Sequence, residues 1–191
     1  MDMQNKQTGE RKRFNTRTVA MVGLMAALVF VGTFLRIKIP VGTDDTMLHF
    51  GNVFCLLSGL LFGGVPGGLA AGIGSALFDL CSEYASEAWI TFINKFVMGL
   101  VAGLIAHWGA KAAGKARMIV AAVCGSLSYC VLYIAKTIIT QRLIYAMPWA
   151  GVWPIVAVKG AVTLTNGLIA VAASLILYYV LKPALQRAHI L

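Results

Sequence analysis

Charged residues are scarce in this chain. Only 12% of the 191 residues are Asp, Glu, Lys or Arg, and 59% are hydrophobic; about a quarter of a typical soluble domain is charged. A chain with so little charge cannot present a polar surface to water on every side, which favours an integral membrane protein. Its length suits one compact helical bundle and is too short for two membrane domains.

Motifs for catalysis, metal binding and nucleotide binding are also missing. The four cysteines form no CxxC pair, so they indicate neither a zinc site nor a disulfide framework, and we expect small packing residues. They are Cys55, Cys81, Cys124 and Cys130. No HExxH or Ser-centred elbow occurs, and glycine-rich stretches lie only in apolar segments. We therefore expect no enzyme activity, no bound metal or cofactor, and no direct use of ATP.

Six apolar segments account for most of the chain. They are roughly Thr18–Leu35, Leu48–Gly63, Gly67–Cys81, Trp89–Trp108, Met118–Ile139 and Pro154–Leu181. A membrane span needs about 20 apolar residues, which the first, fourth, fifth and sixth segments provide. The second and third are short and are separated by a Gly/Pro-rich stretch, which favours a turn. The predicted fold is an all-α membrane protein of six transmembrane helices, in which the bundle shields a short second/third helix hairpin.

Ten basic residues predict the orientation. They are Lys6, Arg11, Lys12, Arg13 and Arg17 before the first span, Lys111, Lys115 and Arg117 between the fourth and fifth, and Lys182 and Arg187 after the sixth. With six spans all ten lie on one face, which should be cytoplasmic. The opposite connections carry four acidic residues, Asp44, Asp45, Glu83 and Glu87. We expect both termini to be cytoplasmic in a multi-pass cell-membrane protein.

The same layout divides the chain into three regions. Residues 1–17 form a basic cytoplasmic tail, 18–182 the membrane domain, and 183–191 a second cytoplasmic tail. Residues 36–47, 82–88 and 140–153 are predicted to face outward. The first span is too long to be a cleavable signal peptide.

Four ionisable residues fall inside predicted spans: Asp79, Lys95, Lys136 and Lys159. Ionisable groups are costly in hydrocarbon and usually mark a functional site. Lys95 lies six residues after Trp89, or about 9 Å along a helix. The other three lie at similar depth, so the sequence predicts a polar site in the outer half of the bilayer.

Neighbouring polar and aromatic residues complete a candidate small-molecule pocket. The proposed site residues are Asp79, Trp89, Asn94, Lys95, Tyr133, Lys136, Trp153, Lys159 and Asn166. Lys95 and Lys159 would donate hydrogen bonds to ligand, and the two asparagines would fix its orientation. Tyr133 and Trp153 would pack on a flat ring, and Asp79 would position a lysine.

Structural roles compete with these assignments. The tryptophans could belong to an interfacial belt, and Lys136 could extend outward to water. Asp79 could form a purely structural ion pair, and Asn166 a hydrogen bond between helices.

Small residues recur four positions apart, a spacing that lets helices approach closely. They are Gly23 and Ala27, then Gly64, Gly68, Gly72 and Ala76, then Gly99 and Gly103. Packing within the bundle explains most of these pairs. Docking to another membrane protein is the alternative for Gly23 and Ala27.

Three stretches resemble a known family. They are Leu48-His49-Phe50-Gly51-Asn52-Val53, the glycine-rich run Gly59–Leu80 that ends in Leu77-Phe78-Asp79-Leu80, and Thr91-Phe92-Ile93-Asn94-Lys95-Phe96-Val97-Met98-Gly99. In these stretches, and in size and six-helix layout from Thr18 to Lys182, the chain is similar to the substrate-binding S components of energy-coupling factor (ECF) vitamin importers.

The resemblance implies a division of labour. An S component binds a vitamin from outside, while a partner module of one membrane scaffold and two ATPase subunits uses ATP to drive transport. Family members dock on the scaffold through small residues of the first helix. Here Gly23, Ala26 and Ala27 occupy that region, and Gly23/Ala27 replaces the usual alanine pair.

The resemblance also suggests a substrate class. The third-to-fourth-span pattern is similar to the subgroup linked with pyridoxine or the hydroxymethylpyrimidine precursor of thiamine, and Lys, Tyr and Trp suit a flat, acceptor-rich heterocycle. A carboxylate vitamin such as pantothenate or folate would also suit the lysines. The main alternative function is a stand-alone secondary transporter or channel, which would need acidic residues in the inner half. A membrane enzyme is a third possibility, but the sequence contains no recognisable catalytic group.

Overall fold

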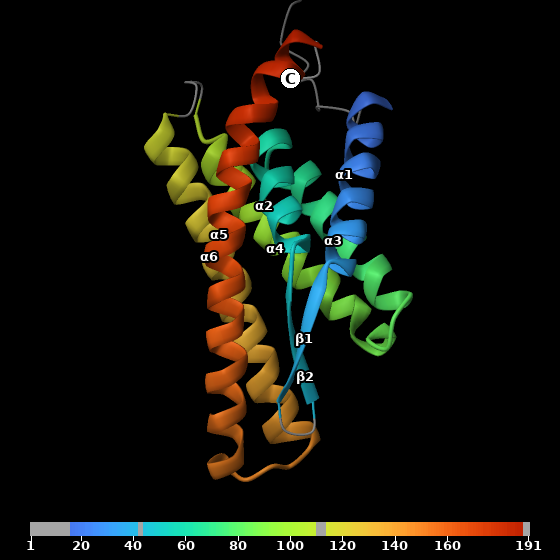
Figure 1. Cartoon of the computed structure of the whole chain (residues 1–191), viewed down its shortest axis with the longest axis vertical. Coiled ribbons are helices and arrows are strands. Elements are labelled where there is room, and N and C mark those ends of the chain that lie inside the picture. The colour runs from blue at the N-terminus through green and yellow to red at the C-terminus, as the bar shows by residue number, and fades with distance from the viewer. Residues whose placement is uncertain (1–15, 42–43, 110–113, 189–191) are drawn as a thin grey trace, which may run out of the picture.

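Six helices and one β-hairpin make up the computed structural model, which describes residues 16–41, 44–109 and 114–188 (Figure 1). The elements are α1 (Thr16–Phe34), β1 (Arg36–Val41), β2 (Asp44–His49), α2 (Gly51–Phe62), α3 (Gly64–Leu80), α4 (Ala88–Ala106), α5 (Lys115–Ile139) and α6 (Trp149–Arg187). A 3₁₀ turn, Ala85–Glu87, precedes α4, and a π-helical turn, Thr140–Ile144, follows α5.

Four of the helices are long and apolar enough to cross a membrane. With their flanking turns they span Thr16–Phe34, Ala85–Ala106, Lys115–Ile144 and Trp149–Arg187. They correspond to the first, fourth, fifth and sixth predicted segments. α2 and α3 have only 12 and 17 residues, which confirms the predicted short hairpin.

The expectation of an all-α chain was wrong between α1 and α2. Residues 36–47 were predicted to be an outward loop, and Leu48 to start a helix. Instead β1 and β2 pair antiparallel from Arg36↔His49 to Val41↔Asp44. The cause is the alternation of Ile37, Ile39 and Val41 with Arg36, Lys38 and Pro40, because a period of two favours a strand.

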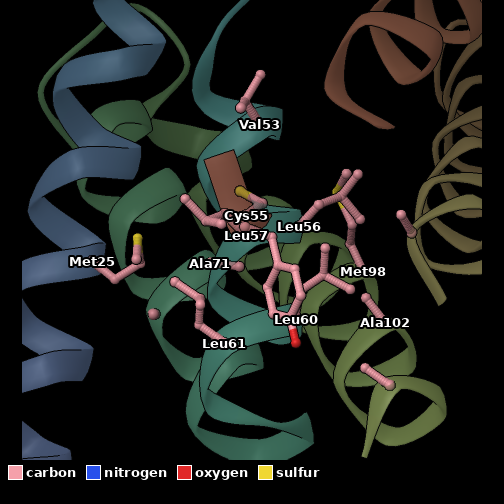
Figure 2. Packing of buried hydrophobic residues seen from close by; sticks show 14 of the residues in the cluster. Met25, Val53, Cys55, Leu56, Leu57, Leu60, Leu61, Ala71, Met98 and Ala102 are labelled. Carbon is pink, nitrogen blue, oxygen red and sulfur yellow. The ribbon is translucent and has the colours of Figure 1, made fainter. Parts of the chain in front are cut away.

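α2 forms the centre of the bundle. Its residues Cys55, Leu56, Leu57 and Leu60 are at most 1% exposed. Figure 2 shows them among side chains of the surrounding helices, including Met25 of α1 and Met98 of α4. A helix buried on all sides needs apolar residues around its whole circumference, which explains why α2 has no polar face.

Glycine stripes bring α3 and α4 into close contact. A Cβ placed on Gly103 would lie 2.3 Å from the carbonyl carbon of Gly63, and one on Gly99 would lie 2.8 Å from the carbonyl oxygen of Gly67. Side chains have no room at these positions, so the predicted role of the spaced small residues in packing is confirmed here. Gly63 joins α2 to α3 with φ +86°, a conformation that other residues rarely adopt.

α6 is longer than predicted at both ends. Residues 140–153 were expected to form a loop, but α5 continues as the π-helical turn to Ile144 and α6 starts at Trp149. The helix passes through Pro154 and Pro183, because neighbouring groups can compensate for one missing backbone hydrogen bond in a membrane helix. The predicted C-terminal tail is therefore helical as far as Arg187, and Thr16 and Arg17 belong to α1. The rest of the predicted N-terminal tail lies outside the described residues.

The start of α1, the start of α5 and the end of α6 lie at one end of the molecule (Figure 1). The β-hairpin lies toward the opposite end, alongside α5 and α6. We call this the hairpin end.

Candidate functional site

A cavity of about 90 Å³ lies between the hairpin and helices α3 to α6. In this measure one water molecule needs about 10–15 Å³, so the cavity holds more than isolated waters. Its lining residues are mostly polar: Thr33, Asp45, Thr46, Met47, His49, Ser75, Phe78, Asp79, Tyr84, Glu87, Thr91, Lys95, Tyr129, Tyr133, Lys136, Lys159, Thr163 and Asn166. A polar chamber inside an apolar bundle is the arrangement expected of a binding site.

Lys95 contributes a buried ammonium group from α4. The residue is 4% exposed. Its Nζ donates a hydrogen bond to Asn52 Oδ1 of α2 and lies 3.5 Å from the centre of the Tyr129 ring on α5. Both partners are uncharged, and a cation held over a ring is stabilised by about 2 kcal/mol when desolvated.

Lys136 forms an ion pair at the start of α4. Its Nζ lies 2.5 Å from Glu87 Oε1, and both residues line the cavity. The charge of Lys136 is therefore matched by a carboxylate of the protein, a role that the sequence analysis considered for Asp79 and not for Lys136.

Lys159 and Asp79 are the other deeply buried charges of the cavity. They are 4% and 7% exposed and come from α6 and α3. Thr163 shares a face of α6 with Lys159, as its helical spacing predicts, and it also lines the cavity.

Asn166 holds the β-hairpin against α6. Its Oδ1 accepts a hydrogen bond from the backbone N–H of His49 at 3.3 Å, and its Nδ2 donates to the carbonyl of Met47 at 3.2 Å. Asn166 lines the cavity, but its amide is engaged by β2. The structure therefore adds a role in positioning the hairpin that the sequence analysis had not assigned.

The hairpin is also tied to the loop between α3 and α4. Lys38 of β1 donates to Glu83 Oε1, and Arg36 Nη2 lies 3.7 Å from the same oxygen. The Lys38 hydrogen bond is the main reason that the pKa of Glu83 falls from 4.5 to about 2. Tyr84 donates to Asp45 Oδ1 at 2.6 Å; burial first, and then this carboxylate, raise the pKa of Tyr84.

His49 closes the cavity from β2. Its imidazole Nδ1 is buried without a hydrogen-bond partner among the described residues.

The structure brings six of the nine proposed site residues to this cavity: Asp79, Lys95, Tyr133, Lys136, Lys159 and Asn166. Asn94 lines a smaller neighbouring cavity of about 40 Å³, together with Lys95 and Tyr133. Trp89 and Trp153 are 66% and 57% exposed and line neither. Trp153 stacks on Trp149 within α6, with ring centres 5.7 Å apart, so it is not part of a loop above the pocket.

The main omission from the predicted site is the hairpin. Asp45, Thr46, Met47 and His49 all line the cavity, and Thr46 Oγ1 lies 3.5 Å from the hydroxyl oxygen of Tyr133. The Ile/Val alternation in β1 could have revealed the strand. No short-range sequence pattern indicated that the hairpin lies over the cavity.

The three proposed docking residues do not share one face of α1. Gly23 and Ala27 are exposed, and a Cβ on Gly23 would meet nothing within 4 Å. Ala26 is 4% exposed and faces α3, where a Cβ on Gly74 would lie 2.3 Å from its carbonyl oxygen. Its inclusion in an exposed docking face is therefore corrected: only Gly23 and Ala27 are available on the surface.

Comparison with known proteins identifies the family. Residues 13–183 match the family model described as "ECF-type riboflavin transporter, S component". The chain belongs to this family. ECF S components are membrane transport subunits rather than enzymes, in agreement with the four long apolar helices.

Individual relatives agree with this membership. A "UPF0397 protein" of Lactiplantibacillus plantarum is 37% identical over 102 residues, covering 53% of this chain and 51% of that protein. A "UPF0397 protein" of Enterococcus faecalis is 31% identical over 94 residues, covering 49% and 50%. The chain thus matches about half the length of these relatives.

A solved structure has the same fold as this chain. It is described as "Structure and mechanism of the S component of a bacterial ECF transporter", with a TM-score of 0.67 and 19% identity over 88% of this chain and 97% of that one. At this identity the likeness concerns the fold alone.

Proposed function

We propose that this chain is the substrate-binding S component of an ECF transporter and takes up a small water-soluble vitamin or vitamin precursor from outside the cell. The observation that carries the proposal is the polar cavity beneath the hairpin, enclosed by helices of a family of transport subunits. Transport would be energised by a separate module of one membrane scaffold and two ATPase subunits.

The substrate we propose is a single flat heterocycle of the size of pyridoxine or hydroxymethylpyrimidine. Tyr129 and Tyr133 line the cavity with rings 5.8 Å apart, and the lysines offer donors to ring nitrogens or oxygens. Riboflavin is the second candidate, because the family description names it. A cavity of about 90 Å³ favours one ring over three fused rings with a polyol chain.

The proposed topology has six crossings with both termini in the cytoplasm. Support comes from the common end of the molecule at which α1 starts and α6 ends (Figure 1). Arg17, Lys115, Arg117, Lys182 and Arg187 belong to the helix ends at that side, which the positive-inside rule places in the cytoplasm. The cavity then opens outward, beneath the hairpin.

A stand-alone transporter is the less favoured function. Beyond the cavity, toward the other end, the helices meet in an apolar cluster that includes Leu56, Leu60, Met98, Ala102 and Ala121. This cluster interrupts a polar path through the molecule, and the second half of the chain, from Ala88 onward, has no acidic residue to relay a proton.

Mass spectrometry of small molecules released from the purified, denatured protein tests the proposal. A vitamin or vitamin precursor that co-purifies with the wild type and rebinds to emptied protein is the expected result. Recovery of a flavin would identify riboflavin as the substrate in place of a single-ring compound. Concentrative uptake by proteoliposomes that contain only this chain would instead establish the stand-alone transporter.

A further inference from the structure

Asp79 differs from the other two carboxylates that line the cavity. Glu87 is paired with Lys136 at 2.5 Å, and Asp45 accepts the Tyr84 hydroxyl at 2.6 Å. Asp79 reaches the cavity from the last turn of α3 and is 7% exposed. None of the ion pairs among the described residues includes it. Its charge is therefore buried in the cavity without direct contact to a cation of the protein.

The surroundings of the Asp79 carboxylate leave acceptor positions for a ligand. The Thr91 hydroxyl of α4 is the hydrogen-bond donor that the described side chains provide to it. An ionised carboxylate has about four acceptor positions, so one hydroxyl leaves most of them unused. The last turn of a helix carries partial negative charge, which does not stabilise a carboxylate. Buried polar groups need hydrogen-bond partners, so donors from a ligand would be favoured here.

Lys95 provides the complementary donor on the adjacent helix α4. Its Nζ has three N–H groups, one of which donates to Asn52 Oδ1, and it lies 3.5 Å from the centre of the Tyr129 ring. Lys95 and Asp79 line the same cavity and attract each other through space, but they form no direct ion pair in the described part of the chain. Because these opposite charges offset each other, a ligand between them needs a donor and an acceptor rather than a net charge.

We propose that the ligand bridges Asp79 and Lys95. An amino or hydroxyl group on its ring donates a hydrogen bond to the Asp79 carboxylate, and a ring nitrogen accepts one from the Lys95 ammonium group. Asp79 is thereby a specificity-determining residue. It selects an uncharged heterocycle with a polar hydrogen on the ring and disfavours a carboxylate, because like charges repel. The inference rests on the proposed function, since it names the chemical class of the vitamin that the same cavity would hold.

Matched pairs of ring compounds test the inference on the full-length protein in nanodiscs. The first pair is the hydroxymethylpyrimidine precursor with its ring amino group and the same compound with hydrogen in place of that group. The second is pyridoxine with and without its ring hydroxyl. Calorimetric titration should show that, in at least one pair, the compound with the ring donor binds about tenfold or more tightly. This is the lower end of the effect of a hydrogen bond to a charged group.

Asp79→Leu should abolish that preference, because leucine has a similar size and no acceptor. Glu83→Leu is the matched control: it also removes a carboxylate, but Glu83 does not line the cavity, so the ratio of the two affinities should stay as in the wild type. A purely structural role of Asp79 would weaken both compounds together and leave the ratio unchanged. If Asp79→Leu does not fold, Asp79→Asn, which keeps the size of the side chain and removes its charge, should lower the ratio in the same direction.

Three results would overturn the inference: equal or tighter binding of the donor-free compound in both pairs, a ratio that persists in the Asp79 variants, or no binding by any of the four compounds. Release of a vitamin whose ring carries neither an amino nor a hydroxyl group would also overturn it while leaving the proposed function intact. Failure of the proposed function has a different signature, namely concentrative uptake by proteoliposomes that contain this chain alone.

Discussion

Lys159 reaches the cavity from α6, while Lys95 reaches it from α4. We predict that Lys159→Met weakens binding of the released vitamin by about ten- to over a hundredfold, because a charge-assisted hydrogen bond contributes roughly 1.5–3 kcal/mol. Titration calorimetry checks the affinity, and the melting temperature is followed in parallel. Unchanged affinity with unchanged stability would assign Lys159 to the framework instead of the site.

Tyr133 and Trp153 are two aromatic residues of the predicted site that have different surroundings in the structure. Tyr133 lines the cavity, whereas Trp153 is 57% exposed and stacks on Trp149. We predict that Tyr133→Ala lowers vitamin affinity by about tenfold, the upper end of an aromatic contact, and that Trp153→Ala leaves it unchanged. A titration in which Trp153→Ala has the larger effect would return Trp153 to the site, as the sequence had suggested.

Among the elements, the β-hairpin is tied to the α3–α4 loop through Glu83, which contacts Lys38 and Arg36. The carboxylate is held ionised by Lys38, and its pKa is lowered to about 2. Because the folded-state pKa is depressed below 4.5, this contribution to stability is complete above that value and disappears as the pH falls toward 2. Acidification from pH 7 to pH 5 should therefore leave the hairpin closed.

We predict that Glu83→Gln loosens the hairpin at both pH values. Hydrogen–deuterium exchange of the β1 amides, corrected for the intrinsic rate, should increase in the variant, while amides of α6 in the same sample serve as the control. Equal protection of β1 in wild type and variant would show that Asn166 and Tyr84 are sufficient to hold the hairpin.

The α3–α4 contact makes a different prediction about stability. Gly103→Ala would force a Cβ to within 2.3 Å of the Gly63 backbone, and overpacking of this kind costs typically 1–3 kcal/mol. Gly160→Ala is the matched control, since the nearest atom to its Cβ is the end of Ile134 at 3.7 Å, and a helical Ala is favoured over Gly. Thermal unfolding in detergent should show a lower melting temperature for Gly103→Ala alone. A lower value for both variants would point to a general intolerance of substitution.

Local patterns explain which elements could be predicted from the sequence. Apolar length identified the four long helices, and the Gly63–Gly68 stretch divided α2 from α3, because both signals lie within the segments themselves. The depth of Lys95 and Lys159 followed from helical rise, so both were expected in one pocket. The hairpin's place over that pocket depends on contacts between residues more than a hundred positions apart, such as Asn166 with His49, which no local pattern encodes. Trp153 was misplaced because Pro154 was taken as the start of its helix.

At the scale of the whole molecule, α6 is the element most exposed to its surroundings. Only 17% of its most apolar window is buried, against 33–39% for the other three long helices. Its 39 residues extend about 58 Å at 1.5 Å per residue, well beyond the roughly 30 Å hydrocarbon thickness of a bilayer. In a membrane α6 must therefore tilt or project, while α1 with 19 residues matches the hydrocarbon directly. This difference makes α1 the more suitable helix for a close, parallel contact with a partner.

We propose that the exposed small residues of α1 form that contact. Gly23 and Ala27 lie four positions apart on the surface, and a Cβ on Gly23 meets no atom of the chain within 4 Å. We predict that Gly23→Leu or Ala27→Leu abolishes uptake by cells that carry the complete transporter while leaving vitamin affinity unchanged, because a bulky side chain keeps two helices apart.

Two substitutions make this docking test specific. Ala172→Leu places the same bulk on an exposed position of α6 and should preserve uptake, since that face would contact lipid. Ala26→Leu alters a buried position against α3 and should lower the melting temperature, which separates loss of folding from loss of docking. Co-purification with the ATPase module measures assembly directly: it should fail for the Gly23 and Ala27 variants and succeed for Ala172→Leu. Normal assembly and uptake in both α1 variants would move the docking face to another helix, with α6 the next candidate because of its long exposed apolar surface.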